Sequence, residues 1–283
     1  MKVKVGIVVR QDSELARARA KELCAWLRGR VKEIRAVPEL AAELGGAPYP
    51  ESDLFDGLDL IVALGGDGTL LHAVSMNPDH RVPILGINVG ALGFLTGVKQ
   101  EEMLSVMADI LSGKAEPQER MMLQARVMNA EGSHQMRALN EFAVSKDALS
   151  RMIELEARVD GVYVTKFRAD GLVVSTPTGS TAYCMAAGGP IVHQDMRCII
   201  LIPLSAHTLT TRPLVVPDRS TIQVTLVTRH SHVHLTVDGG DGLRLEFGDT
   251  VTITPAAQNL RLFGSPSMNY YEILRTKLGW GEY

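Results

Sequence analysis

The first 113 residues alternate between short apolar runs and segments with helical periodicity, and this alternation limits the possible folds most. Strands are expected over residues 3–9, 58–64 and 83–88, where β-branched and other apolar side chains follow one another. Helices are expected after the first run and over residues 103–111, where apolar residues recur three and four apart. Because strands that alternate with helices pair in parallel through crossovers, the pattern predicts an α/β domain with a parallel sheet.

The pattern changes near residue 119, where short runs bounded by turn residues begin. Asp160-Gly161 separates two of these runs and is a strong hairpin signal, because both residue types tolerate the positive φ of a tight turn. The expected strands are residues 121–128, 137–145, 153–159, 162–167, 198–202, 221–227, 233–237, 244–247 and 250–254. This part of the chain is therefore predicted to be β-rich.

The length of 283 residues accommodates two domains. We predict an N-terminal α/β domain over residues 1–118 and a β-rich domain over residues 119–263. A last helix, capped by Asn269, is expected within residues 264–283.

Composition excludes several classes of protein. The 29 Lys and Arg against 32 Asp and Glu give a net charge of −3, which lacks the basic excess of a nucleic-acid-binding protein. The longest uncharged apolar run, residues 198–206, is far shorter than a membrane span of roughly 20 residues. The 3 Cys are too few and too scattered for a disulfide framework or a zinc site, which favours reduced thiols in a cytoplasmic protein.

A glycine-rich turn follows the second expected strand and precedes a short expected helix over residues 69–75. The turn consists of Gly65, Gly66, Asp67, Gly68 and Thr69. Such turns let a ligand approach the backbone, and the first N–H groups of the helix attract phosphate. A carboxylate beside phosphate is unfavourable unless it has a task, so Asp67 is a candidate base or hydroxyl-orienting group for phosphoryl transfer. Asp-Gly also suits a plain turn, and the chain contains six such pairs.

Several common catalytic motifs are absent from the sequence. A Gly-x-x-x-x-Gly-Lys-Ser/Thr phosphate loop does not occur, and no Gly-x-Gly-x-x-Gly fingerprint follows the first expected strand. Neither His-Glu-x-x-His nor Gly-x-Ser-x-Gly is present. These absences argue against Walker-type nucleotidases, ordinary nicotinamide dehydrogenases, zinc peptidases and α/β-hydrolases.

A second segment that can carry chemistry covers residues 167–183. Its strand bears Arg168 and Asp170 and leads into a loop rich in hydroxyl groups. The planar guanidinium of Arg168 suits phosphate, and the ring of Tyr183 can pack against a base or a ribose. The alternative is a capped helix whose hydroxyl groups satisfy one another.

Taken together, three motifs closely resemble the bacterial NAD kinases. They are Gly-Gly-Asp-Gly-Thr at 65–69, Asn-Glu at 140–141 and Thr-Pro-Thr-Gly-Ser-Thr-Ala-Tyr at 176–183. The resemblance extends to residues 85–95, 188–192 and 207–214 and keeps the family order. The first motif alone also resembles lipid kinases and phosphofructokinases, whereas its combination with the third is highly specific.

The resemblance implies a reaction and its catalytic group. NAD kinases transfer the terminal phosphate of ATP, or in some members of polyphosphate, to the 2′-hydroxyl of the adenosine ribose of NAD. Asp67 would then accept or orient the hydroxyl proton, Gly68 would contribute a backbone contact, and Mg²⁺ would shield the donor phosphates. The family fold is related to those of diacylglycerol kinases and phosphofructokinases. It also implies that the helix within 264–283 packs back on the first domain and that the protein is a homodimer or homotetramer.

The resemblance also assigns the dinucleotide-binding residues. Asn140 and Glu141 would hold the adenosine part, and Asp170 would hold the other end. The full implied set is Asp67, Gly68, His72, Asn140, Glu141, Arg151, Arg168, Asp170, Thr181, Ala182, Tyr183 and Ala186. Alternatives stay open for some of these residues. Asn140-Glu141 alone would suit ordinary strand-edge polarity, Arg151 can be a solvated strand end, and His72, where many members carry Arg or Lys, can be a helix-surface residue.

The sequence departs from the family pattern in three places. Residues 184–186, Cys-Met-Ala, replace a stretch that often carries serine. Ala206 stands where the family commonly has proline, and Gly240 stands where a glutamine often follows Asp-Gly. These departures put individual ligand contacts in doubt and leave Asp67 in place.

Two other functions are considered beside NAD phosphorylation. A lipid or diacylglycerol kinase could use the same glycine turn, although Asn140-Glu141 and the Tyr183 loop suit a nucleotide better. A non-catalytic sensor of NAD or NADP would gain nothing from a carboxylate beside phosphate. The sequence leaves open the choice between ATP and polyphosphate, the preference between NAD and NADH, product inhibition and the number of subunits.

Overall fold

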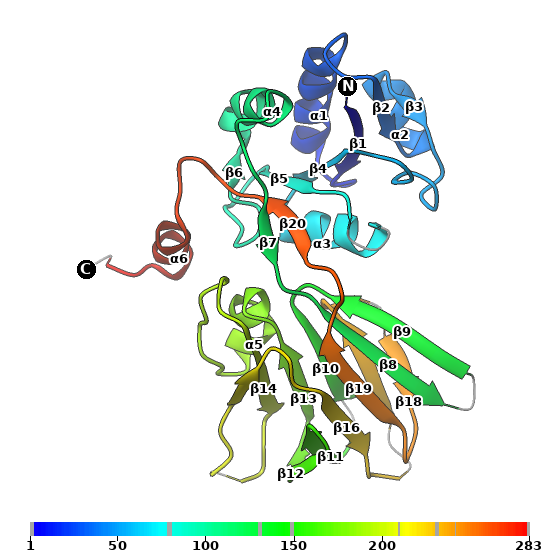
Figure 1. Ribbon diagram of the computed structural model, residues 1–283, viewed down its shortest axis with the longest axis vertical. Helices are drawn as coiled ribbons and strands as arrows, with labels where there is room; N and C mark the ends of the chain where they lie inside the picture. Colours follow the sequence, from blue (N-terminus) through cyan, green and yellow to red (C-terminus); the bar gives the residue numbers. More distant parts are fainter. Residues whose placement is uncertain are drawn as a thin grey trace. The chain divides into compact units, whose positions relative to one another are not determined.

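The computed structural model describes residues 3–77, 81–129, 132–147, 150–208, 210–229, 232–240 and 242–281 (Figure 1). The chain divides into two compact units. Unit 1 comprises Met1–Glu119 and Leu260–Tyr283, and unit 2 comprises Arg120–Asn259. Strands alternate with helices in unit 1, whereas antiparallel strands dominate unit 2. The predicted fold class, an α/β part with a parallel sheet and a β-rich part, is confirmed.

Unit 1 is built on an eight-stranded sheet. Its strands are β1 (Lys4–Val9), β2 (Glu33–Ala36), β3 (Ala47–Pro48), β4 (Leu60–Gly65), β5 (Ile84–Asn88), β6 (Val98–Lys99), β7 (Gln118–Arg120) and β20 (Leu260–Phe263). They lie in the order β3-β2-β1-β4-β5-β20-β7, and β6 pairs with the end of β5. Neighbours from β3 to β20 are parallel, so the carboxyl ends of β1, β4 and β5 share one edge.

The strand order reverses between β1 and β4. β1 is followed by β2 on one side, and β4 is followed by β5 on the other side. In open parallel sheets, loops that diverge in this way leave a crevice outside the carboxyl ends of the two strands. The turn at 65–69 therefore lies at the point of unit 1 where a ligand site is expected.

Unit 1 also contains five α-helices and one 3-10 turn among its described residues. They are α1 (Glu14–Leu27), α2 (Pro38–Leu44), α3 (Asp67–Met76), the 3-10 turn η2 (Gln100–Glu102), α4 (Met103–Leu111) and α6 (Tyr270–Leu278). Ser13 caps α1 by accepting a hydrogen bond from Ala16 N. Asn269 caps α6 as predicted, and Glu272 completes a reciprocal capping pair with it. Ile7 of β1 belongs to the core shared with α1, so Val8 faces the opposite side of the sheet.

Unit 2 contains two six-stranded antiparallel sheets. One sheet has the order β15-β14-β13-β10-β17-β18, and the other has the order β12-β11-β16-β19-β8-β9. The strands are β8 (Leu123–Asn129), β9 (Gly132–Ala138), β10 (Glu141–Lys146), β11 (Ile153–Val159), β12 (Val162–Ala169), β13 (Gly171–Ser175), β14 (Cys198–Leu204), β15 (Leu214–Pro217), β16 (Ile222–Leu226), β17 (Val233–Val237), β18 (Gly242–Leu245) and β19 (Thr250–Pro255). Two short helices, η3 (Thr178–Thr181) and α5 (Tyr183–Ala186), follow β13.

Both faces of the strands β10, β13 and β14 are buried. Phe142 and Leu172 point into a core shared with the other sheet, which contributes Leu155 and Val224. On the opposite face, Ala143, Val173 and Ile200 pack with Cys184 of α5 and with Val192. The segment that carries the Thr-Pro-Thr-Gly-Ser-Thr-Ala-Tyr motif is thus anchored on a fully buried sheet.

Several predicted elements are present, and others differ. The Asp160-Gly161 hairpin is confirmed, with φ values of 52° and 79°. The single strand expected over residues 137–145 is wrong, because β9 ends at Ala138 and β10 begins at Glu141 in a different sheet. The segments β2, α2 and β20 were not predicted. Among the described residues no helix is long and apolar enough to cross a membrane.

Candidate active site

The glycine-rich turn joins the end of β4 to the start of α3. A Cβ atom on Gly65 would lie 2.3 Å from Thr69 Oγ1, so the turn can close in this way only around a glycine. At Gly66 and Gly68, in contrast, no neighbouring atom of the described residues lies within 4 Å of the Cβ position. Their missing side chains leave open space beside the first turn of α3, where phosphate is attracted.

The carboxylate of Asp67, the first residue of α3, is held by the loop that follows β5. Oδ2 accepts a hydrogen bond from Phe94 N at 2.8 Å. Oδ1 accepts bonds from Leu95 N at 3.1 Å, from Thr96 N at 2.9 Å and from Thr96 Oγ1 at 2.9 Å. Each oxygen of an ionised carboxylate can accept about two hydrogen bonds. Oδ1 has no acceptor site left, whereas Oδ2 can accept one more hydrogen bond.

Residues 93–97 form the loop that holds Asp67, and this loop is itself fixed. Asn88, at the end of β5, donates from Nδ2 to Thr96 Oγ1 at 3.2 Å. A Cβ atom on Gly93 would lie 2.0 Å from Asp67 Oδ1, so only glycine allows the carboxylate to come this close to the backbone. Asn88, Gly93 and Thr96 therefore position the candidate catalytic group.

The last helix contacts the same loop. Lys277 Nζ of α6 lies 5.4 Å from the centre of the Phe94 ring, within the range of a cation–π interaction. A Cβ atom on Gly97 would lie 3.3 Å from Ile273 Cδ1, which leaves no room for a larger residue without a shift. The C-terminal segment of unit 1 thus supports the loop around Asp67.

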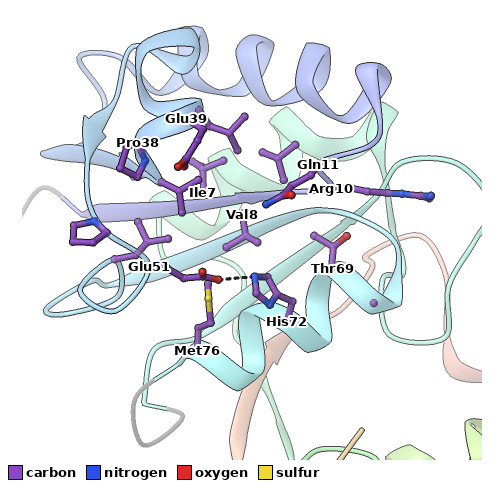
Figure 2. A pocket seen from close by; sticks show the side chains of 16 residues that line it. Ile7, Val8, Arg10, Gln11, Pro38, Glu39, Glu51, Thr69, His72 and Met76 are labelled. Carbon is purple, nitrogen blue, oxygen red and sulfur yellow. Dashed lines mark ion pairs between the residues drawn. The ribbon is translucent and has the colours of Figure 1, made fainter. Parts of the chain in front are cut away.

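A cavity of about 730 Å³ opens along α3, whose Gly68, Thr69, His72 and Met76 line it (Figure 2). It is lined by residues at the end of β1, by the start of α2, by residues 50–54 and by α3 itself. His72 lies in its wall, and its Nε2 is 2.9 Å from Glu51 Oε1. Gly68, Thr69 and His72 therefore share this cavity.

In unit 2, Asn140 and Glu141 stand at the start of β10 and are held there by Asp238. The carboxylate of Asp238 accepts hydrogen bonds from the N–H groups of Leu139 at 2.9 Å, Asn140 at 2.7 Å and Glu141 at 3.0 Å. Asp238 has a φ of 49°, a left-handed conformation that Asp tolerates better than most residues. It follows β17, which pairs with β10, so the sheet brings the two segments together.

The loop after β13 is joined to Leu139 and Asn140, at the start of this segment. Thr176 donates from Oγ1 to Leu139 O at 2.6 Å and accepts a hydrogen bond from Gly179 N at 3.0 Å. A Cβ atom on Gly179 would lie 2.2 Å from Asn140 O, so a larger residue there would push the loop away. The Asn-Glu motif and the Thr-Pro-Thr-Gly-Ser-Thr-Ala-Tyr motif thus form one cluster.

This cluster contains buried polar atoms that have no hydrogen-bond partner among the described residues. They are Asn140 Oδ1, Glu141 Oε2 and Thr178 Oγ1. Leaving such an atom unpaired costs about 1–3 kcal/mol, and native structures tolerate this mainly where a ligand, ion or water completes the site. Three such atoms on neighbouring segments can form hydrogen bonds with a polar ligand.

The same cluster holds two carboxyl groups at close quarters. Burial, together with the charge of Asp238, raises the pKa of Glu141 to about 8. Burial also raises the pKa of Asp238 above its ordinary value, although its three N–H donors favour the charged form. Near neutral pH the Glu141 carboxyl is therefore protonated.

The residues predicted after Thr181 lie beside Glu141. Glu141 accepts a backbone hydrogen bond from Tyr183, whose side chain is exposed. Thr181 is buried and donates from Oγ1 to Thr178 O at 3.3 Å. Cys184, one of the departures from the family pattern, is buried in an apolar cluster and its pKa is raised by that burial. Ala182 and Ala186 flank it on the same short helix segment.

The remaining predicted residues lie at the other end of β13. Asp170 precedes this strand, and Lys146 Nζ lies 3.4 Å from its Oδ1. The five residues of β13 span about 17 Å. Asp170 lies at one end of this strand, and Asn140 and Glu141 lie beside its other end. Arg168 lies on β12, and its side chain is exposed. Arg151 is also exposed, and it lies near the same end of the sheet because Ile153, two residues later, pairs with Ala169. Unit 2 thus presents two groups of predicted residues and not one.

No resident metal site is found in the described part of the chain. No group of three or more His, Cys, Asp or Glu residues there could hold a metal ion. Three hydrogen bonds from the loop at 93–97 already engage Asp67 Oδ1. These residues do not form a protein cage for a cation, but Mg²⁺ often binds chiefly through substrate phosphates and water.

Sequence reasoning missed the residues that position the site. Asp238 was not among the predicted site residues, and its signal in the sequence is a carboxylate directly before two glycines, Gly239 and Gly240. Gly93 and Thr96 give no signal by themselves. Their role depends on how closely the loop approaches Asp67, which only the folded chain shows.

Comparisons with known proteins identify the family. Residues 51–115 match the ATP-NAD kinase N-terminal domain, and residues 139–264 match the ATP-NAD kinase C-terminal domain. The NAD kinase of Geobacter sulfurreducens is 43% identical over 284 residues, which covers 99% of each chain. The NAD kinase of Geobacter metallireducens is 40% identical and also covers 99% of each chain.

Solved structures agree with these relatives. A yeast NADH kinase complexed with NADH is similar with a TM-score of 0.91 and 26% identity, covering 100% of this chain and 89% of that one. An NAD kinase from Archaeoglobus fulgidus in complex with ATP has a TM-score of 0.76 and 27% identity, covering 98% of this chain and 97% of that one. On the sequence relatives and on both domain matches, the chain belongs to the NAD kinase family.

Proposed function

We propose that this member of the NAD kinase family uses Asp67 to transfer the terminal phosphate of ATP to the 2′-hydroxyl of the adenosine ribose of NAD, giving NADP and ADP. The observation that supports this proposal most is the position of the Asp67 carboxylate. Phe94, Leu95 and Thr96 hold it at the first turn of α3. NAD phosphorylation follows from the family, and relatives whose structures hold ATP and NADH support both substrates.

The chemical step forms one bond and breaks another. The ribose 2′-oxygen bonds to the terminal phosphorus, the bond from that phosphorus to the bridging oxygen of ADP breaks, and the hydroxyl proton moves to Asp67. Oδ2 is the proposed acceptor because only Phe94 N occupies it among the described residues. A free Asp is a weak base, with a pKa of about 3.9, so it assists mainly as the hydroxyl acidifies in the transition state. Positioned bases of this kind contribute about 10²–10⁴-fold.

The donor phosphates are proposed to lie at the first turn of α3. The open space at Gly66 and Gly68 admits phosphate oxygens close to the backbone. Mg²⁺ is proposed to arrive with the triphosphate, because the described residues offer no cluster of ligands for it. When bound there, it would neutralise charge on the transferring group.

The dinucleotide contacts are proposed from the residues that the family resemblance assigns. In unit 2, the unpartnered atoms of Asn140, Glu141 and Thr178 would bind the adenosine part, with Tyr183 against a ring. Asp170 is proposed to hold the other end. The remaining proposed contacts are Gly68, His72, Arg151, Arg168, Thr181, Ala182 and Ala186, together with Asp67.

A coupled assay tests this proposal. The enzyme is given ATP, Mg²⁺ and NAD, and NADP is detected with an NADP-specific dehydrogenase. We expect NADP to form with NAD, and no phosphate transfer when 2′-deoxyadenosine-containing NAD replaces it. Binding of NAD without any ATP-dependent NADP formation would favour the sensor over the kinase.

A further inference from the structure

The last helix of unit 1, α6, packs on the loop that holds the Asp67 carboxylate. Lys277 Nζ lies 5.4 Å from the centre of the Phe94 ring, at one end of that loop. At the other end, a Cβ atom on Gly97 would lie 3.3 Å from Ile273 Cδ1. Lys277 follows Ile273 by four residues, so both side chains lie on one face of the helix. That face therefore contacts the loop on either side of the residues that bind the carboxylate.

Phe94 connects α6 directly to the carboxylate. Its ring lies against Lys277, and its backbone N–H donates to Asp67 Oδ2 at 2.8 Å. Oδ2 accepts no second hydrogen bond from the described residues, and it is the oxygen proposed to take the ribose hydroxyl proton. A shift of Phe94 therefore changes the orientation of the reacting oxygen itself.

The strand β5 secures the other oxygen of the same carboxylate. Thr96 donates to Asp67 Oδ1 from both N and Oγ1. Asn88 of β5 donates in turn to Thr96 Oγ1 at 3.2 Å, and a Cβ atom on Gly86 would lie 3.1 Å from Thr96 Cγ2. The carboxylate is thus held from two directions, with β5 behind Oδ1 and α6 behind Oδ2.

The helix α6 is well capped but has little core of its own. Asn269 and Glu272 form the reciprocal cap at its start, and Gly279, with a φ of 66°, ends it. Leu274 is the buried residue of the helix, whereas Lys277 is exposed. Replacing Lys277 therefore leaves the core intact and changes chiefly the contact with Phe94.

We propose that α6 is a positioning element for Asp67 and that Lys277 is its positioning residue, because the ammonium group on the Phe94 ring keeps the Phe94 N–H against Oδ2. In this role Lys277 touches neither ATP nor NAD and acts on turnover through Phe94. The inference rests on the proposed function, which makes Oδ2 the proton acceptor. An exposed cation–π contact changes an equilibrium by a factor of about two to five, which sets the size of the expected effects.

The test removes the charge with Lys277→Met. We expect kcat to fall about threefold, with KM for ATP and KM for NAD within about 1.5-fold of the wild-type values. Lys277→Arg keeps a cation over the ring and should retain the wild-type kcat. The matched control is Arg275→Met, which removes a charge from another exposed position in the last turn of α6 and should leave kcat unchanged.

Two double-mutant cycles show whether the effect passes through Phe94 and Asp67. Phe94→Leu removes the ring and keeps the N–H, so it should lower kcat about threefold, and Lys277→Met should lower it no further in that variant. Lys277→Met should also have no effect on the residual turnover of Asp67→Asn, followed with labelled ATP. An undiminished loss from Lys277→Met in either background would overturn the inference.

Hydrogen exchange provides a readout that does not depend on activity. In Lys277→Met, the amides of residues 94–96 should exchange about threefold faster than in the wild type, whereas those of β5 should not change. Exchange and kcat equal to those of Arg275→Met, or an effect confined to the KM for ATP or NAD, would overturn the inference. Wild-type enzyme that makes no NADP would instead refute the proposed function, and faster exchange at residues 94–96 would still support positioning by α6.

Discussion

At the scale of single residues, Asp67 carries the proposed chemistry, and its neighbours define its orientation. Three of its four hydrogen bonds come from backbone N–H groups of Phe94, Leu95 and Thr96, so the carboxylate is placed by the main chain. Such placement needs no reorganisation as the reaction proceeds. Oδ2, with one bond, is left to meet the ribose hydroxyl.

Asp67→Asn tests this role. The amide oxygen can keep the bonds from Leu95 and Thr96, whereas the amide nitrogen would face the Phe94 N–H as a second donor. We expect kcat to fall about 10²–10⁴-fold because the proton acceptor is lost. The dissociation constant for NAD, measured by calorimetry, should stay close to the wild-type value. Full turnover in this variant would remove Asp67 from the mechanism.

Glu141 gives the dinucleotide site a pH dependence. Its pKa of about 8 means that the carboxyl is protonated at neutral pH and becomes charged as the pH rises through that value. Charging it beside Asp238 and the negative diphosphate of NAD is unfavourable. We expect NAD affinity to be highest below pH 8 and to fall above it, when binding is titrated between pH 6.5 and 9.5.

Glu141→Gln is the matched control for this pH dependence. Glutamine has the same shape and cannot ionise, so the variant should show NAD affinity that is independent of pH in this range. Wild-type affinity that increases with pH, or an unchanged pH profile in Glu141→Gln, would contradict the assignment of the proton to Glu141.

At the scale of elements, the loop of residues 93–97 links the end of β5 to the candidate base. Gly93→Ala would place a methyl group 2.0 Å from Asp67 Oδ1, so the carboxylate or the loop must move. We expect kcat to fall at least about tenfold, because small displacements of catalytic groups are costly. Circular dichroism should show that the fold is retained.

Gly264→Ala is the control for this loop variant. Its added methyl group would meet only Gln118, at 3.6 Å or more, which is ordinary contact distance. Its kcat should equal that of the wild type. Equal activity of Gly93→Ala and Gly264→Ala would show that the loop does not position Asp67.

Elements with a strong local pattern were predictable from sequence, and those defined by distant partners were not. The Asp160-Gly161 turn and the Asn269 cap depend on residues close in sequence, and both are confirmed. β20 consists of four residues, and its Leu262 pairs with Ile84 of β5, 178 positions earlier in the chain. No local sequence pattern acts over such a separation. The break between β9 and β10 depends on Asp238, nearly 100 residues away.

At the scale of the whole molecule, the fold class followed from periodicity, whereas the function followed from motifs in a fixed order. The candidate site was predictable only as far as these motifs reach. Asp67 and Asn140-Glu141 stand in them, but the groups that hold those residues were visible only after folding. The cavity beside α3 has no sequence signal, because its walls come from four separate segments.

The number of subunits stays a prediction. The sheets of unit 2 end in the strands β12 and β15, where exposed apolar residues such as Val162, Tyr163 and Val215 occur. Edge strands with exposed apolar side chains favour association between copies. We expect light scattering to give two or four times the chain mass of 30.8 kDa. A monomer at micromolar concentration would contradict this expectation.

The most direct test of the central claim follows the phosphate itself. Enzyme is incubated with ATP labelled in the terminal phosphate, together with NAD, NADH and a diacylglycerol in the same mixture. Label is predicted on the 2′-oxygen of the adenosine ribose of NAD in the wild type and to be nearly absent in Asp67→Asn. Label on the lipid, or equal labelling of NAD by both proteins, would contradict the account.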